Sequence, residues 1–133
     1  MATTIDNTLD VIDSRNVIER IEELRDERDA HDEGESGRSW AEEYPADAEE
    51  LRALEALQAQ AEGYARDWCY GEVLIRDSYF EDYARELAED LHGDAVRRTE
   101  WPFSCIDWGE AANALKHDYT AIDFDGVTYW VRP

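Results

Sequence analysis

Residues 120–131 read Thr-Ala-Ile-Asp-Phe-Asp-Gly-Val-Thr-Tyr-Trp-Val, and this stretch decides the fold. Its centre, Asp125–Gly126, is a residue pair that two-residue β-hairpin turns prefer, because both turn positions take positive φ angles. Residues that favour strands lie on both sides of it. We therefore predict an antiparallel hairpin with strands 120–124 and 127–131. Such a hairpin is marginal alone, so it must pack on a helix or pair with the short apolar run Val73–Ile75.

Two helices are predicted between that apolar run and the closing hairpin. Ser78 and Glu81 form the S-x-x-E capping pattern that marks the start of a helix, and this helix should end at Gly93. Asp107 and Glu110 form a second capping pattern ahead of another apolar face. The fold class that we predict for residues 64–133 is therefore α+β, with two helices and a short antiparallel sheet that ends in the β-hairpin.

The front half of the chain has a different character, because nearly all aromatic residues follow Gly63. Residues 1–12 are predicted to be a flexible arm, and residues 13–63 an antiparallel helical hairpin. Pro45 suits the first turn of its second helix, and Gly63 suits its end. The apolar stripes of the two helices are narrow, so the hairpin needs a partner surface. That surface is either the rest of the chain or a second subunit.

Charge is the strongest compositional feature. The 133 residues carry 34 Asp and Glu against 13 Lys and Arg, a formal net charge of −21. This charge repels nucleic acid and anionic membranes. Apolar residues make up 43% and aromatic residues 11% of the chain, which is too many for a disordered acidic tail. We expect a cytoplasmic protein that binds neither nucleic acid nor membrane directly.

The sequence contains no recognisable catalytic or metal-binding motif. His31, His92 and His117 lie far apart and share no ligand spacing with Cys69 or Cys105. Phosphate-loop, dinucleotide and nucleophile-elbow patterns are missing as well. We expect no enzyme, no catalytic residues, no metal and no cofactor.

Carboxylates recur at helical spacing in two places, Glu19–Glu23–Glu27 and Asp82–Glu86–Glu89–Asp90. Residues three or four apart on a helix are about 5–6 Å apart along its axis. This spacing is comparable to that of phosphates along a DNA strand, which rises about 3.4 Å per charge. A groove that holds DNA with Lys and Arg would attract such a row. Composition does not separate this interpretation from three alternatives. These are a solvated face that serves solubility, adaptation to high salt, and codon bias in a GC-rich genome.

Residues 74–90 read Leu-Ile-Arg-Asp-Ser-Tyr-Phe-Glu-Asp-Tyr-Ala-Arg-Glu-Leu-Ala-Glu-Asp, and short segments of similar character follow. These segments are Trp101–Pro102, Ile106–Trp108, Asp118–Thr120 and Phe124–Trp130. Together they resemble the C-terminal part of the ArdA-type antirestriction family of phages and mobile elements. The resemblance covers about residues 64–132. The hairpin before it is similar to the leading helices of short phage versions.

The resemblance implies a non-catalytic inhibitor of a host defence nuclease. Members of this family are acidic DNA mimics, often dimers, that occupy the DNA-binding groove of type I restriction–modification enzymes. The implied partner is a basic groove of a restriction protein or, in an anti-CRISPR version, of a CRISPR effector, with a homodimer as one arrangement. The acids that the resemblance implies as contacts are Asp77, Glu81, Asp82, Glu86, Glu89 and Asp90, and the charge pattern adds Glu19, Glu23 and Glu27.

A second hypothesis is an acidic structural or regulatory interaction module. In that case the 13–63 hairpin is an assembly surface, and the acids serve only solubility.

Overall fold

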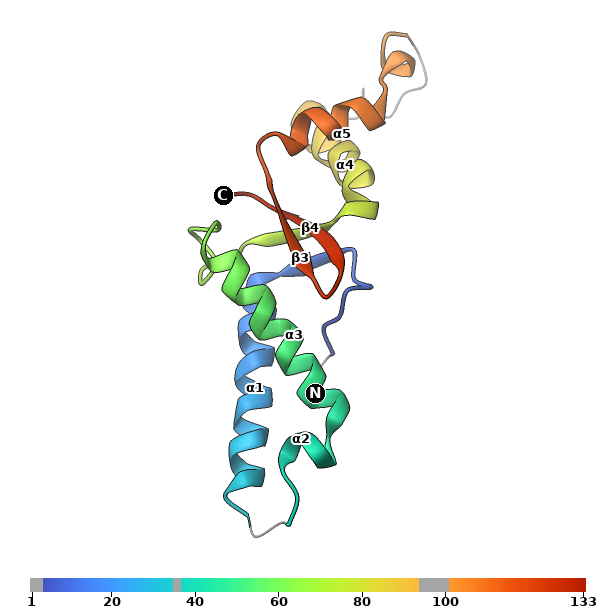
Figure 1. Ribbon diagram of the computed structural model, residues 1–133. Helices are drawn as coiled ribbons and strands as arrows, with labels where there is room; N and C mark the ends of the chain where they lie inside the picture. Colours follow the sequence, from blue (N-terminus) through green and yellow to red (C-terminus); the bar gives the residue numbers. More distant parts are fainter. Residues whose placement is uncertain (1–3, 35–36, 94–100) are drawn as a thin grey trace.

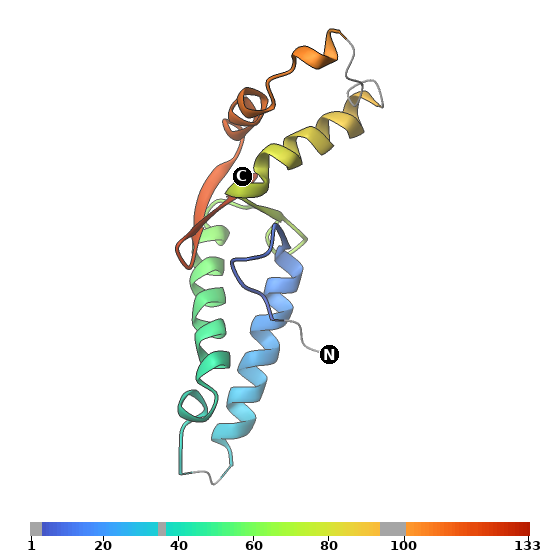
Figure 2. The same ribbon diagram turned by 90° about the vertical axis from the view of Figure 1, so that its right-hand side faces the viewer.

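The protein is elongated in this computed structural model, which describes residues 4–34, 37–93 and 101–133. A sheet lies in the middle, a helical hairpin extends from one side of it, and two further helices extend from the other (Figures 1 and 2). The helices are α1 (Ser14–Asp32), α2 (Trp40–Glu43), α3 (Pro45–Glu62), α4 (Phe80–His92) and α5 (Trp108–Lys116). The strands are β1 (Val11–Asp13), β2 (Val73–Arg76), β3 (Thr120–Phe124) and β4 (Val127–Val131). The predicted α+β class is confirmed.

The β3–β4 hairpin has the predicted strands and turn. Pairing runs from Thr120 opposite Val131 to Phe124 opposite Val127. Both turn residues have positive φ, 49° at Asp125 and 91° at Gly126, as a primed turn requires.

The hairpin belongs to a four-stranded antiparallel sheet with the order β1-β2-β4-β3. The apolar run predicted as its partner is β2, and Leu74 pairs with Val131. The first strand was not expected. Residues 1–12 were predicted to be a flexible arm, but Ile12 pairs with Leu74 and is 3% exposed, and Ile5 is 7% exposed. The prediction is wrong for residues 4–12, because these isoleucines fill the core; residues 1–3 lie outside the described part.

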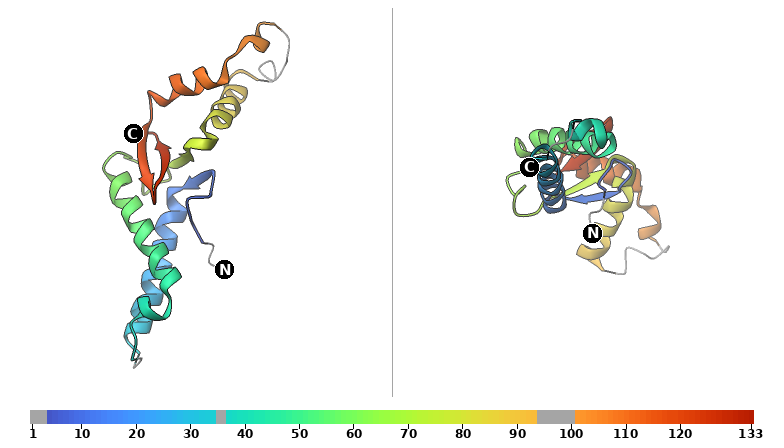
Figure 3. Two further views of the ribbon diagram at one scale, coloured as in Figure 1. Left: turned by 45° about the vertical axis from the view of Figure 1, so that its right-hand side comes forward. Right: turned by 90° about the horizontal axis from the view of Figure 1, so that it is seen from below.

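One face of the sheet packs against α1 and α3 (Figure 3). Leu74, Tyr129 and Val131 on the sheet join Val17 and Leu54 on the helices in one buried cluster. The helical hairpin therefore covers its apolar stripe with the rest of its own chain.

The opposite face of the sheet is covered at one end by α4 and α5. Phe80 and Ala84 of α4 and Ala112 of α5 form a second, smaller core with Ile75, and Trp130 packs against it. This part extends away from the sheet on the side opposite to the α1–α3 hairpin (Figure 3).

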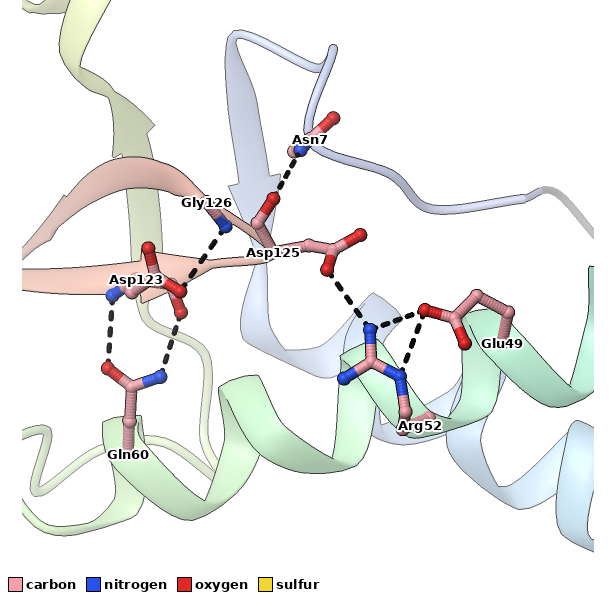
Figure 4. Close-up of polar contacts among 7 residues, drawn as sticks. All are labelled: Asn7, Glu49, Arg52, Gln60, Asp123, Asp125 and Gly126. Carbon is pink, nitrogen blue, oxygen red and sulfur yellow. Dashed lines mark hydrogen bonds and ion pairs between the residues drawn. The ribbon is translucent and has the colours of Figure 1, made fainter.

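Side chains of α3 fix the turn and the exposed edge of β3 (Figure 4). Gln60 Nε2 donates to the Asp123 carbonyl at 2.8 Å, and the Asp123 N–H donates to Gln60 Oε1 at 3.0 Å. Arg52 Nη2 lies 3.0 Å from an Asp125 carboxylate oxygen. An edge strand needs such partners because its outer backbone groups are unpaired.

The predicted starts of α3 and α5 and the predicted end of α4 are confirmed, the predicted start of α4 is not, and the short helix α2 was not predicted. Pro45 occupies the first turn of α3, and Asp107 caps α5 by accepting from the Glu110 N–H at 3.1 Å. The predicted Ser78 cap is wrong. A short 3₁₀ turn, Asp77–Tyr79, precedes α4, and no side chain caps the helix. The Ser78 hydroxyl accepts from Arg76 Nη1 instead.

Candidate functional site

The outer face of α1 carries a continuous row of carboxylates. The buried side of the helix is formed by Ser14, Val17, Arg20, Ile21 and Leu24. The residues on the opposite side are Glu19, Glu22, Asp26 and Asp29, all exposed, and we call this row the α1 stripe. Successive members are three or four residues apart, so their separations along the helix axis are about 4.5–6 Å.

The predicted row Glu19–Glu23–Glu27 is divided by the structure. Only Glu19 belongs to the α1 stripe. Glu23 is partly buried and accepts from Arg20 Nη1 at 3.1 Å. Glu27 is exposed but lines a cavity near the far end of the hairpin. Helical spacing also puts Glu22, Asp26 and Asp29 opposite the apolar positions 17, 21 and 24, but the predicted contact row did not include them.

The acids of α4 form a second row. Asp82, Glu86 and Asp90 are exposed, and Glu89 is half-buried. We call these four residues the α4 stripe. Glu86 accepts a hydrogen bond from the Tyr79 hydroxyl at 2.7 Å.

The remaining acid predicted on α4 lies on another side of the helix. Glu81 is exposed and stands one turn before Arg85, whose guanidinium lies 5.2 Å from the centre of the Trp108 ring.

Asp77 differs from the other predicted contact residues, because its carboxylate is bound within the chain. Its Oδ1 accepts from Trp130 Nε1 at 2.9 Å and from Lys116 Nζ at 3.1 Å. The hydrogen bond from Trp130, followed by that from Lys116, lowers the pKa of Asp77 below its ordinary value. This residue joins the 3₁₀ turn to α5 and β4, which gives it a structural role.

Many basic side chains are engaged by acids of the same chain. Arg20 forms a buried pair with Glu50, at 2.8 Å between Nε and Oε2. Arg25 pairs with Glu55 at 2.8 Å, so two arginines of α1 are bound to carboxylates of α3. These two cations lie between the helices. Arg28 pairs with Asp29 of the α1 stripe at 3.4 Å, so the excess of negative charge on the stripe comes from Glu19, Glu22 and Asp26.

The described part of the chain shows neither a metal site nor a membrane span. In residues 4–34, 37–93 and 101–133, His, Cys, Asp and Glu side chains nowhere gather in the threes or more that could hold a metal ion. Among the helices of these ranges, none has the length and apolar character needed to cross a membrane. Cys69 and Cys105 are free and exposed.

Comparisons with known proteins give no relative from which the use of this surface could be transferred. No family model matches the chain, no curated protein matches its sequence, and no solved structure matches its fold.

Proposed function

We propose that the protein is a non-catalytic inhibitor that presents carboxylates in place of DNA phosphates to a basic groove of a host defence nuclease. The observation that carries this proposal is the α1 stripe, an outward row of four acids. Arg20 and Arg25 of the same helix pair with α3, and Arg28 pairs with Asp29 at the end of the row. The α4 stripe adds a second row at the other end of an elongated molecule (Figure 2).

The spacing of the acids supports this function. Carboxylates about 4.5–6 Å apart along a helix axis give a charge density of the same order as one DNA strand, with about 3.4 Å per phosphate. A groove lined by Lys and Arg is attracted to either. The net charge of −21 adds long-range attraction to such a groove.

The helical hairpin does not expose its apolar residues as an assembly surface. Its apolar residues Val17, Ile21 and Leu24 are at most 1% exposed and pack within the chain. The interaction-module hypothesis would therefore need another surface. A homodimer stays a prediction.

A competition assay tests the proposal. A type I restriction enzyme and, separately, a CRISPR effector are mixed with labelled target DNA, and the protein is added. We expect the protein to displace DNA from one of these nucleases, and we expect raised KCl to weaken the inhibition. If a large excess at physiological salt leaves both enzymes bound to DNA, the proposal in this form is refuted.

Charge-neutralised variants then locate the surface. Glu19→Gln, Glu22→Gln and Asp26→Asn together remove three acids of the α1 stripe. Each exposed ion pair contributes up to about 1 kcal/mol, so their loss should weaken inhibition about 10- to 100-fold.

The matched control removes the same charge elsewhere. Glu62, Asp67 and Asp118 are exposed acids outside both stripes. Their neutralisation to Gln, Asn and Asn should leave inhibition within about twofold, which is about 0.4 kcal/mol. Equal losses in both triple variants would mean that net charge, and not the α1 stripe, is responsible.

A further inference from the structure

The far end of the helical hairpin holds an open cavity that the proposed function does not use. Its volume is about 470 Å³, and it is lined by Glu27, Ala30, His31, Trp40, Tyr44 and Asp47. The lining comes from the end of α1, from α2 and from the start of α3, at the part of the hairpin most distant from the sheet (Figure 1). We call it the hairpin-tip pocket.

Aromatic rings form one wall of this pocket. Trp40 is 4% exposed, so the surrounding chain fixes its ring. Tyr44 is 49% exposed and makes an edge-to-face contact with His31, at 6.0 Å between ring centres and 89° between planes. The His31 ring is itself held by Glu43, at 2.5 Å between Nε2 and Oε2. The wall is therefore fixed on one side and open to an incoming group at Tyr44.

Carboxylates stand beside the aromatic wall. Glu27 is exposed on α1, and Asp47 is half-buried in the first turn of α3. Among the described residues that line the pocket, none is Lys or Arg. A cation that enters therefore meets the exposed Tyr44 ring and two carboxylates from different helices. It also meets the His31 imidazole, whose pKa is raised by its hydrogen bond to Glu43.

We propose that the hairpin-tip pocket binds an arginine side chain of a partner protein. A guanidinium is planar, stacks on aromatic rings and pairs with carboxylates through two parallel hydrogen bonds. An ammonium group is more strongly hydrated and lacks the planar fork, so the pocket should prefer arginine to lysine. This inference is independent of the proposed function, because it depends on the chemistry of the pocket and not on the two stripes.

The test uses the full-length protein labelled with ¹⁵N and three short peptides, Ac-Gly-Xaa-Gly-NH₂ with arginine, lysine or citrulline as Xaa. Citrulline has the shape of arginine without its charge. The Trp40 indole resonance, assigned by comparison with Trp40→Phe, reports binding at the pocket. We expect this resonance to shift when the arginine peptide is added at millimolar concentrations. The same shift should require at least about fivefold more of the lysine or citrulline peptide, a difference in binding free energy of about 1 kcal/mol.

Two variants test the carboxylates and the ring. Glu27→Gln with Asp47→Asn, and separately Tyr44→Leu, should each weaken arginine binding about fivefold or more. The matched control Glu62→Gln, at the other end of α3, should leave it unchanged.

Three outcomes would overturn the proposal. They are equal shifts with citrulline or lysine, an equal loss in the control variant, or no shift of Trp40 at about 10 mM arginine peptide, which corresponds to a binding free energy weaker than about −3 kcal/mol. Because no nuclease is present, none of these outcomes bears on the DNA-mimic proposal.

Discussion

Replacing Glu50 by alanine should destabilise the protein far more than replacing any exposed acid, because Glu50 neutralises a buried arginine. The side chains of Arg20 and Glu50 are 8% and 7% exposed. Two parallel hydrogen bonds join them, at 2.8 Å from Nε and 2.9 Å from Nη2. Glu50 Oε2 also accepts from the Ile5 N–H at 3.1 Å, so one carboxylate connects α1, α3 and the N-terminal segment.

The expected magnitude follows from this burial. Removing one partner of a buried ion pair costs about 3–5 kcal/mol when the other charge is left buried and unpaired. Arg20 keeps its contact with Glu23 at 3.1 Å, so we expect a loss at the lower end of this range. For a chain of this size the loss corresponds to a fall in Tm of roughly 10–15 °C. The matched control is Glu55→Ala. Its pair with Arg25 also joins α1 to α3 at 2.8 Å, but the side chains are 43% and 39% exposed. An exposed pair contributes about 0.2–1 kcal/mol.

Urea unfolding of both variants, followed by circular dichroism, measures the difference. Glu50→Ala with a loss no larger than that of Glu55→Ala would refute the reasoning. The double variant Arg20→Met, Glu50→Leu separates charge from packing. It should be more stable than Glu50→Ala, since an apolar pair of similar volume leaves no buried charge. If it is equally unstable, the cost comes from lost packing.

Three further predictions concern single contacts. Asp77→Ala should cost about 0.5–1.5 kcal/mol in urea unfolding, because it removes an exposed hydrogen bond from the Trp130 indole N–H that water can replace. Since the pKa of Asp77 is lowered, its stabilisation is present at neutral pH and is lost as the pH falls through that lowered value. The Glu43 hydrogen bond raises the pKa of His31, so this contact stabilises the hairpin tip below the ordinary histidine pKa and is lost as the pH rises through the raised value. An NMR titration should show the pKa of His31 returning toward its ordinary value in Glu43→Gln. Gly126→Ala should lower stability by about 1 kcal/mol in thermal unfolding, because its φ of 91° disfavours a side chain.

Local chemistry explains which parts of the fold the sequence could predict. The Asp125–Gly126 turn, the Asp107 cap and Pro45 at the start of α3 each depend on residues within a few positions. The N-terminal segment before α1 has no such local signal in its sequence. A strand of three residues, Val11–Asp13, is too short to display alternation, and Ile5 becomes a core residue only when α3 and the sheet are both in place.

The same distinction applies to the candidate site. Steps of four residues, as in Glu19–Glu23–Glu27, rotate roughly 40° each around a helix, so this row turns away from the exposed face. Alternating steps of three and four follow that face and give the α1 stripe. The hydrogen bond between Asp77 and Trp130 joins residues 53 positions apart, which no local pattern contains.

The α1 stripe is not explained by stability or solubility. Like charges three or four residues apart on a helix destabilise it by about 0.2–0.5 kcal/mol per pair. A net charge of magnitude about 2–8 suffices to keep a small domain soluble, and this chain carries −21. Adaptation to high salt would require acids on the surface, but it would not require them to form a row. A basic partner requires an outward row of acids that the arginines of the same helix do not fully neutralise; here Arg28 pairs only with Asp29, the last acid of the row. On α1, Arg20 and Arg25 are bound to carboxylates of α3, while Glu19, Glu22 and Asp26 face outward. This arrangement favours a basic partner over adaptation to salt.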